Sequence, residues 1–150
     1  MNNAGGRYPR AKVIGVLQSG NRLLVEEFSG VHSKGFGTYY RPIGGSIEFG
    51  EKSEDALLRE FEEELQVKVE IKNYMGCIEN IFSINEQRGH EILQVYGVEF
   101  SEKENYAKEK FEILEGGQSS FANWVNLADF IDGVKILYPD SLVCKLEGGN

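Results

Sequence analysis

At 150 residues the chain is long enough to form one domain with a substantial core, and its 41% hydrophobic and 27% charged residues are globular averages that argue against disorder. The net charge of −8 and the pI of about 4.9 exclude an ordinary binder of DNA or RNA, which needs a basic surface to displace counterions from phosphates. No run of about 18 apolar residues occurs, and residues 1–12 contain no apolar stretch of signal-peptide length. We therefore expect one cytoplasmic domain over residues 1–150 that has no membrane or nucleic-acid partner.

The first part of the chain predicts a hairpin and a loop. Residues 11–18 and 22–28 are rich in apolar and β-branched residues and flank Ser19-Gly20-Asn21, which predicts a β-hairpin over 11–28. Residues 29–37 contain three glycines and predict a mobile loop in which Phe36 could belong to a substrate lid. His32 and His90 have no evident catalytic partner, so we expect both to be surface or loop residues rather than ligands.

An extended run over 38–43 follows and ends in Gly44-Gly45, where we expect a tight turn. Within this run, Tyr39, Tyr40 and Arg41 could stack on a base or bind a phosphate, and packing in the core or on the surface is an equal alternative.

A helix of about 13 residues is predicted from Ser53, which is a good N-cap residue. Acidic residues follow in its first turn, where the helix dipole favours them. Apolar side chains then recur at helical spacing and would face the core; they are Leu57, Leu58, Phe61 and Leu65.

The second half of the chain predicts more strands. Residues 69–84, with a break near Gly76, and residues 90–100 have strand-like composition. Residues 101–117 are highly charged and resemble a variable insertion. The two cysteines, Cys77 and Cys144, lie in apolar surroundings without a metal-binding spacing, so we expect buried free thiols.

A short strand over 119–127 contains Trp124, which we expect in the core, and leads into a helical turn at 128–131. A last helix is expected to start near Pro139-Asp140 and to run through 141–147. Strands interleaved with few helices predict a mixed α/β or α+β domain.

The segment from residue 45 to 67 contains the chemically informative residues. Glu60, Glu63 and Glu64 cover one arc of the helical wheel beside the apolar face, whereas Glu62 falls toward solvent. Like charges at this spacing repel by roughly 0.2–0.5 kcal/mol per pair, and a divalent cation would offset that repulsion. Carboxylates are the hard oxygen ligands that Mg²⁺ or Mn²⁺ prefers, and a solvated acidic face is the alternative.

Three further residues complete this pattern. Arg59 precedes Glu63 by four residues and can orient or partly neutralise the cluster. Glu51 lies just before the helix and can fold back onto Arg59. Gly45 permits close backbone approach, and its carbonyl is available as a metal ligand.

The spacing of Gly45, five residues, Glu51, seven residues and then Arg59-Glu60-Phe61-Glu62-Glu63-Glu64 resembles the Nudix box of the Nudix (MutT-like) pyrophosphohydrolases. Residues 11–27 also resemble the first hairpin of that family, and Trp124-Val125-Asn126-Leu127 resembles its late strand end. The resemblance implies an α/β/α sandwich with a mixed sheet between helices. It also implies hydrolysis of a pyrophosphate bond in a nucleoside diphosphate linked to another moiety.

For the individual residues, the resemblance implies that Glu60, Glu63 and Glu64 bind one or more divalent cations, Mg²⁺ or Mn²⁺, with help from the carbonyl of Gly45. It implies that Arg59 holds the cluster in position with Glu51 as its partner. The base that activates water would be one of the three glutamates or a carboxylate outside the box, with Glu91 and Glu115 as candidates.

Two departures from the family pattern occur. Gln66 replaces the usual glycine near the end of the box, and a positive φ there would strain glutamine by about 1 kcal/mol. Pro42-Ile43-Gly44-Gly45 replaces the usual Pro-Gly-Gly. Neither change removes a carboxylate.

Three hypotheses follow. The leading one is a metal-dependent Nudix hydrolase, and the rival is a catalytically weak Nudix-fold module that binds a ligand or senses it. A calcium-binding helix is the third, and the absence of an Asp-rich calcium loop in the sequence counts against it. The substrate stays open among oxidised nucleoside triphosphates, nucleotide sugars, ADP-ribose and dinucleoside polyphosphates, and a homodimer is one alternative for the oligomeric state.

Overall fold

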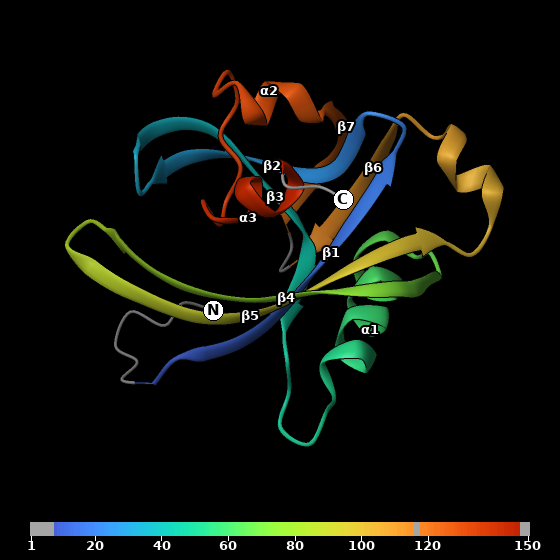
Figure 1. Ribbon diagram of the computed structural model, residues 1–150, viewed down its shortest axis with the longest axis horizontal. Coiled ribbons are helices and arrows are strands. Elements are labelled where there is room, and N and C mark those ends of the chain that lie inside the picture. The colour runs from blue at the N-terminus through green and yellow to red at the C-terminus, as the bar shows by residue number, and fades with distance from the viewer. Residues whose placement is uncertain (1–7, 116–117, 148–150) are drawn as a thin grey trace.

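Seven strands form one mixed sheet with helices on both faces (Figure 1). The computed structural model describes residues 8–115 and 118–147, with the backbone alone at 114, 115 and 118. Its elements are β1 (Arg10–Ser19), β2 (Arg22–His32), β3 (Gly35–Ser46), α1 (Ser53–Leu65), β4 (Val69–Ile84), β5 (Gln87–Phe100), the 3₁₀ helix η1 (Lys103–Ala107), β6 (Lys110–Glu115), β7 (Gln118–Asn126), α2 (Leu127–Ile131) and α3 (Leu142–Glu147). The predicted sandwich of a mixed sheet between helices is confirmed.

The strand order is β4-β5-β1-β3-β2-β7-β6. Strands β1 and β5 pair in parallel, and the other neighbours pair antiparallel. The sheet is therefore mixed, and β3 lies at its centre between two strands that precede it in the sequence.

The first predicted hairpin is present only next to its turn. Strands β1 and β2 pair at two positions beside that turn, Gln18 with Leu23 and Ser19 with Arg22. Beyond them, β3 separates the two strands, because its first part pairs with β2 and its last part pairs with β1. Beyond the turn, the backbone N–H and C=O groups on the facing edges of β1 and β2 form hydrogen bonds with β3 instead of with each other, so the two strands diverge.

The loop predicted over 29–37 is wrong, because these residues extend β2 and β3 into a hairpin. The pairing continues to His32 opposite Gly35, and only residues 33–34 form the turn. Gly30 and Gly37 have φ values of 146° and 143°, which L-residues with side chains rarely adopt. The glycines thus allow a strongly twisted strand pair rather than a loop.

Gly44 and Gly45 form no tight turn, and the close backbone approach that they also allow is what the structure shows. Both glycines lie within β3, opposite Ile14 and Val13 of β1. A Cβ at Gly44 would overlap the carbonyl oxygen of Val13, so glycine is needed here for the close approach of two strands.

The described part of the predicted insertion, residues 101–115, continues the fold at the edge of the sheet. Helix η1 is followed by β6, which pairs with β7 at the edge of the sheet. Phe111 and Ile113 are buried while their charged neighbours Lys110 and Glu112 are exposed, and this alternation of period two is typical of a half-buried strand. The many charged residues in this segment obscure that alternation in the sequence, so no strand was predicted there.

Helix α1 has the predicted length of 13 residues, Ser53–Leu65. Its N-cap residue is Lys52, and the Ser53 hydroxyl makes a hydrogen bond of 2.7 Å with the Tyr96 hydroxyl instead of capping the helix. Gln66 ends the helix with φ 59° and ψ 38°, so the residue that replaces the usual glycine does adopt the left-handed conformation.

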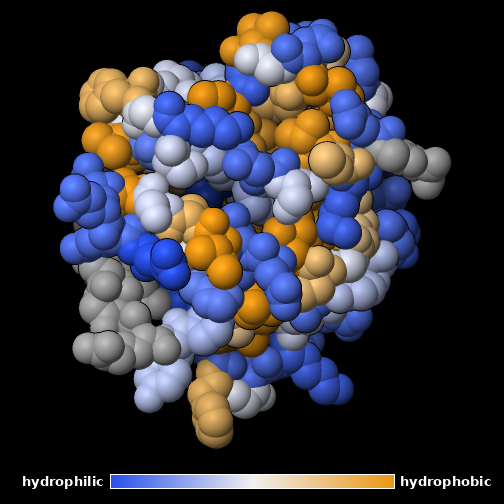
Figure 2. Space-filling model, turned by 60° about the vertical axis from the view of Figure 1, so that its left-hand side comes forward, coloured by the Kyte–Doolittle hydropathy of each residue, from blue (hydrophilic) through white to orange (hydrophobic). Residues whose placement is uncertain are grey.

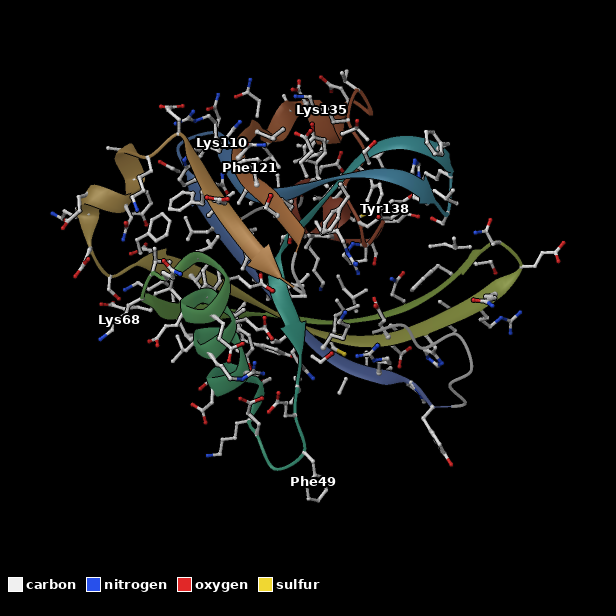
Figure 3. The ribbon with its side chains drawn as sticks, turned by 180° about the vertical axis from the view of Figure 1, so that it is seen from behind. Phe49, Lys68, Lys110, Phe121, Lys135 and Tyr138 are labelled. Atoms are coloured by element: carbon white, nitrogen blue, oxygen red, sulfur yellow. The ribbon has the colours of Figure 1, made fainter. Side chains whose placement is uncertain are left out.

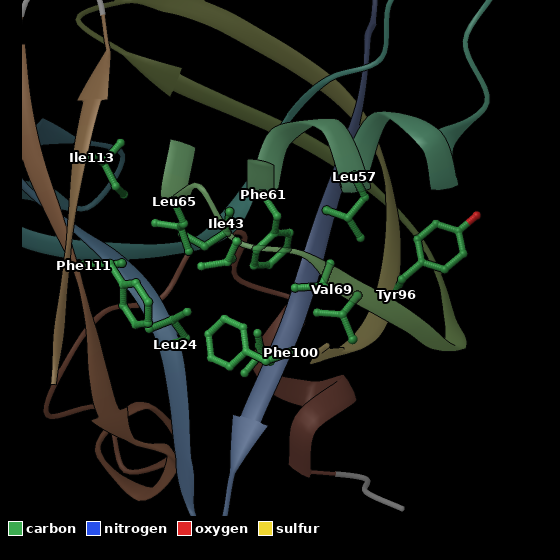
Figure 4. Close-up of a cluster of buried hydrophobic side chains, with 14 of the residues drawn as sticks. Leu24, Ile43, Leu57, Phe61, Leu65, Val69, Tyr96, Phe100, Phe111 and Ile113 are labelled. Atoms are coloured by element: carbon green, nitrogen blue, oxygen red, sulfur yellow. The ribbon is translucent and has the colours of Figure 1, made fainter. Parts of the chain in front are cut away.

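The core has one cluster on each face of the sheet. Leu57, Phe61 and Leu65 of α1 point into the first cluster, as predicted, and meet side chains from the strands (Figure 4). Trp124 belongs to the same cluster and is 9% exposed, which confirms its predicted place in the core. On the other face, Phe130 of α2 and Leu142 of α3 cover the second cluster.

The other predicted elements are present with shifted boundaries. Strand β4 carries irregular pairing before Gly76, β5 begins three residues earlier than predicted, at Gln87, and α3 begins at Leu142. Both cysteines, Cys77 and Cys144, are free but exposed, so the prediction of buried thiols is wrong. Within the described residues, no helix is both long and apolar enough to cross a membrane.

Candidate active site

Arg59 joins the segment before α1 to the glutamates of the helix. Its Nε and Nη2 donate to the two carboxylate oxygens of Glu51 at 2.8 and 3.0 Å, and Nη2 also donates to the carbonyl of Ser46 at 3.0 Å. Its Nη1 donates to Glu60 at 3.1 Å and to Glu63 at 3.3 Å. The predicted contact between Glu51 and Arg59 is present, and it is a bidentate one.

This pairing changes the protonation behaviour of both partners. The hydrogen bonds from Arg59, together with one from the backbone N–H of Glu48, lower the pKa of Glu51 to about 2. The same bonds raise the pKa of the Arg59 guanidinium. Phe49 lies between Glu48 and Glu51, at the tip of the segment before α1, and points away from the molecule (Figure 3).

Gly45 and Glu60 lie in direct contact. A Cβ at Gly45 would overlap the Glu60 carboxylate, so the close approach expected at this glycine is made by a side chain of α1. The pKa of Glu60 is raised, chiefly by burial and also by the charge of Glu63, against hydrogen bonds to Glu64 and Arg59 that lower it.

The three predicted ligands therefore lie together. Glu60 lies beside Glu64, Arg59 bridges Glu60 and Glu63, and Glu62 is exposed to solvent. Glu63 is the most open of the three, with 60% of its side chain exposed.

The potential ligands of this cluster are all oxygens, which a hard divalent cation prefers, and they lie around the half-buried carboxylate of Glu60. As they stand, no three His, Cys, Asp or Glu side chains of the described residues are arranged to hold a metal ion.

A cavity of about 350 Å³ lies between the β2–β3 hairpin, the β4–β5 hairpin and residues 138–140. The two hairpins extend on the same side of the molecule (Figure 1), where hydrophobic and hydrophilic side chains alternate over the surface (Figure 2). Its volume is in the range of small-molecule sites. Residues that line it include His32, Tyr39, Arg41, Phe82, Glu91 and Tyr138.

Aromatic side chains form one wall of the cavity. Tyr39 stacks on Phe28 with ring centroids 5.2 Å apart and meets Tyr138 edge to face at 5.6 Å. His32 is 7% exposed and makes a hydrogen bond of 2.7 Å with the Tyr138 hydroxyl. The expected surface position of His32 is thus wrong, because residues 138–140 fold back over the hairpin.

The tip of the β2–β3 hairpin contacts residues 138–140 as well. Lys34 makes a salt bridge of 3.0 Å with Asp140, and its backbone N–H donates to the Tyr138 hydroxyl at 3.2 Å. Phe36 is 80% exposed at this tip, and its role in a lid stays a prediction.

Charged side chains form another part of the cavity wall. Glu91 is 7% exposed, and its Oε2 lies 3.6 Å from Nζ of Lys12 and 3.6 Å from Nη2 of Arg41. Its Oε1 accepts a hydrogen bond of 3.3 Å from Asn80. Burial lowers the pKa of Lys12, and the charge of Arg41 lowers it further.

These contacts place Glu91, one of the two bases predicted outside the box, away from the glutamate cluster. Glu91 lies in the cavity wall rather than beside Glu60, and the side chain of Glu115 is outside the described residues. Sequence reasoning missed Lys12, for which the only signal is a charged residue within an apolar strand.

Ser46 connects the cavity wall to the glutamate cluster. It follows Gly45 in β3 and lies opposite Lys12 of β1. Its hydroxyl accepts a hydrogen bond of 2.8 Å from Arg10, and its carbonyl accepts one from Arg59. A continuous series of contacts therefore runs from α1 to the cavity.

A larger cavity of about 610 Å³ lies elsewhere, against α3 and strands β1, β4 and β5. It is lined by polar and charged residues, among them Lys72, Glu99 and Lys145, together with apolar ones, and no predicted site residue with a described side chain lines it.

The chain is similar to known proteins. A family model described as the NUDIX domain matches residues 7–141. A search of curated proteins found no match. Among solved structures, a MutT NUDIX hydrolase from Burkholderia pseudomallei has 21% identity and a TM-score of 0.61, covering 83% of this chain and 88% of that one.

Two more structures extend the comparison. A NUDIX hydrolase from Nitrosomonas europaea has 15% identity and a TM-score of 0.67, covering 93% of this chain and 87% of its own. A UDP-X diphosphatase has 16% identity and a TM-score of 0.58, covering 93% of this chain and 60% of its own. At these identities the structural likeness shows the fold alone, whereas the family match spans most of the chain.

Proposed function

The chain belongs to the NUDIX domain family, and from this premise we propose that it hydrolyses, with a divalent cation, a pyrophosphate bond in a nucleoside diphosphate linked to another moiety. Membership makes it a Nudix hydrolase, and the family in general cleaves pyrophosphate bonds. The metal dependence and the nucleotide nature of the substrate are the parts that we propose.

The observation that carries the proposal is the arrangement around Arg59. One guanidinium bonds Glu51, Glu60 and Glu63 together, and Gly45 makes room for the Glu60 carboxylate. Glu60, Glu63 and Glu64, with the carbonyl of Gly45, would hold Mg²⁺ or Mn²⁺. When bound, the cation would neutralise charge on the pyrophosphate and lower the pKa of bound water.

Residues of the chain itself would position the carboxylates and accept the proton of the attacking water. Arg59 would keep the carboxylates at fixed positions. Its N–H groups already donate hydrogen bonds to protein acceptors, so the guanidinium is not needed to bind the substrate. One glutamate of the cluster would accept the proton of the attacking water. Glu91 is a weaker candidate for that role, since Asn80 and two cations already engage its carboxylate.

The cavity beside the cluster would receive the organic part of the substrate. Its volume of about 350 Å³ and its aromatic wall suit a flat ring. A solved structure with the same fold is named a UDP-X diphosphatase, which supports a nucleotide-type substrate.

The test measures phosphate or nucleotide release from nucleotide sugars, ADP-ribose, dinucleoside polyphosphates and oxidised nucleoside triphosphates, with Mg²⁺ or Mn²⁺ and with chelator as control. We expect chelator-sensitive turnover of at least one compound, reduced by about 100-fold in Glu63→Gln and Glu64→Gln. Glu62→Gln is the matched control, because Glu62 is exposed outside the cluster. Full activity in both cluster variants would refute these roles.

The second candidate is a catalytically weak Nudix-fold binding module. It is favoured by the finding that the carboxylates of the described residues do not form a ready metal site. Ligand-dependent stabilisation without turnover of any compound would support it. A homodimer and a cytoplasmic location stay predictions.

A further inference from the structure

We propose that Tyr96 of β5 is a positioning residue for the active site, because its hydroxyl holds the start of α1 at a fixed place on the sheet. Helix α1 carries Glu60, Glu63 and Glu64, so its place on the sheet sets where those carboxylates lie. The inference rests on the proposed function for what the glutamates do. It adds a residue from a strand that lies outside the box.

A hydrogen bond between two hydroxyl groups joins α1 to β5. The hydroxyls of Ser53 and Tyr96 lie 2.7 Å apart, and Ser53 is the first residue of the helix. A serine at this end of a helix commonly caps it, yet here the N-cap residue is Lys52 and makes no side-chain capping bond. Tyr96 is buried, and a buried hydroxyl without a partner is costly. Ser53 therefore serves the contact with the sheet rather than its own helix.

Tyr96 stands beside the place where α1 approaches the sheet. In the parallel pairing of β1 with β5, Tyr96 lies opposite Gly15. A Cβ at Gly15 would be 2.9 Å from Cε2 of Phe61 and 3.3 Å from the methyl groups of Leu57, so this glycine makes room for the apolar face of the helix. The Tyr96 ring lies at the Leu57 end of the same cluster (Figure 4). The helix thus covers a glycine and has a large aromatic residue next to it.

Hydrogen bonds supply a direction that the apolar contacts of α1 lack. The hydrophobic effect is non-directional, so apolar packing alone does not fix where on a sheet a helix lies. A hydrogen bond requires a short distance and a nearly linear arrangement. Ser53 is bonded to Tyr96 at the start of α1, and Arg59 is bonded to the carbonyl of Ser46 near its middle. Directional contacts at two separate points fix the helix along its axis and about it.

The ring of Tyr96 is supported from β4 by a second tyrosine. Tyr74 lies opposite Tyr96 in the antiparallel pairing, and the two ring centroids are 5.2 Å apart. The Tyr74 hydroxyl donates a hydrogen bond of 2.5 Å to the side chain of Gln94 of β5 rather than to the helix. Tyr74→Phe is therefore a matched control for Tyr96→Phe, because each removes one hydroxyl from the same surroundings.

The first test follows the backbone amide of Gly45 in proton–nitrogen NMR spectra of the full chain without metal. Gly45 lies against the Glu60 carboxylate, so its resonance reports where α1 lies. We expect Tyr96→Phe to shift this resonance by more than its line width, and Ser53→Ala to shift it in the same direction. The double variant should shift it no further, because both substitutions remove one bond. Tyr74→Phe should leave the resonance in place.

The second test is the affinity for Mn²⁺, measured from the EPR signal of the free ion. Once the helix populates other positions, only a fraction of the molecules holds the carboxylates together, and the apparent affinity falls by that fraction. We expect Tyr96→Phe and Ser53→Ala each to bind Mn²⁺ about 5-fold more weakly than Tyr74→Phe, the effect of one hydrogen bond between uncharged groups. Ser53→Thr keeps a hydroxyl and should retain most of the affinity.

Unfolding in urea separates positioning from stability, because a substitution that lowers stability alone leaves the resonances of the folded state in place. The proposal is overturned if the Gly45 resonance of Tyr96→Phe coincides with that of the wild type, or if Tyr96→Phe binds Mn²⁺ as tightly as Tyr74→Phe does. A wild type that binds no Mn²⁺ would refute the proposed metal site alone, since the NMR comparison involves no metal and still decides the role of Tyr96.

Discussion

The backbone of Gly45 in β3 lies against the carboxylate of Glu60 in α1, so closely that no side chain can be added between them. A strand and a helix thus meet at the residue where the family pattern begins. This contact sets how near the strand backbone comes to the carboxylate cluster.

Gly45→Ala should therefore disable the site while leaving the fold intact. The added methyl group would displace the Glu60 carboxylate from β3, and overpacking of this kind costs about 1–3 kcal/mol. We expect metal-dependent hydrolysis to fall by at least about 10-fold, because small misplacements of catalytic groups are expensive. Turnover and the free energy of unfolding in urea measure the two effects. Wild-type turnover in a folded variant would show that the contact is unimportant.

The pair of Glu51 and Arg59 predicts a dependence of stability on pH. A carboxylate whose pKa is lowered from 4.5 to about 2 stabilises the folded state fully above pH 4.5, and this contribution is lost as the pH falls toward 2. Glu51→Gln should therefore be less stable than the wild type at neutral pH, and the difference should disappear as the pH falls below 2. Unfolding in urea over this range measures the difference.

Glu54→Gln is the matched control for this experiment, because Glu54 is an exposed acidic residue in the first turn of α1. Its difference from the wild type should stay small at every pH. A deficit of Glu51→Gln that persists unchanged down to pH 2 would contradict the pKa assignment.

Glu91→Ala should destabilise the fold through Lys12. The change leaves a largely buried ammonium without its carboxylate, which costs about 1–3 kcal/mol. Adding Lys12→Met should recover much of that loss, because the variant then has no unpaired charge at residue 12. The exposed Glu79→Ala on β4 is the control and should change stability by about 0.5 kcal/mol or less. Equal losses in the single and double variants would argue against the pairing.

Gln66→Gly should stabilise the protein. Gln66 has φ 59° after the last turn of α1, where a side chain costs about 1 kcal/mol and glycine is favoured. We expect a gain of up to about 1 kcal/mol in the free energy of unfolding. Lys68→Gly, at an exposed position without positive φ, should destabilise instead. A loss of stability in Gln66→Gly would show that the glutamine side chain contributes to the fold.

Features of short range could be predicted from the sequence. Helix α1, the burial of Leu57 and Phe61 and the contact between Glu51 and Arg59 all follow from spacing within about 15 residues. A helix places residues on its faces by a fixed angle, so the carboxylates could be grouped before any partner was known. Around Phe111 and Ile113, charged residues obscured the alternation of buried and exposed positions, so strand β6 was not predicted.

Features that join distant segments depended on the tertiary structure. The glycines of residues 29–37 resemble a loop in isolation, yet pairing of β2 with β3 makes them strand tips. His32 is buried against Tyr39 and Tyr138, and Tyr138 is 106 residues away in the sequence. The exposure of Cys77 and Cys144 likewise follows from which faces of β4 and α3 are left uncovered.

The sequence by itself determined the carboxylate-bearing helix and its family pattern, because helical periodicity is a local property of the chain. The tertiary structure decided which groups face that helix. Lys12, Arg41 and Glu91 belong to three different strands, and only the insertion of β3 between β1 and β2, with β5 parallel to β1, brings them together. Strand order results from long-range pairing, which no local pattern encodes.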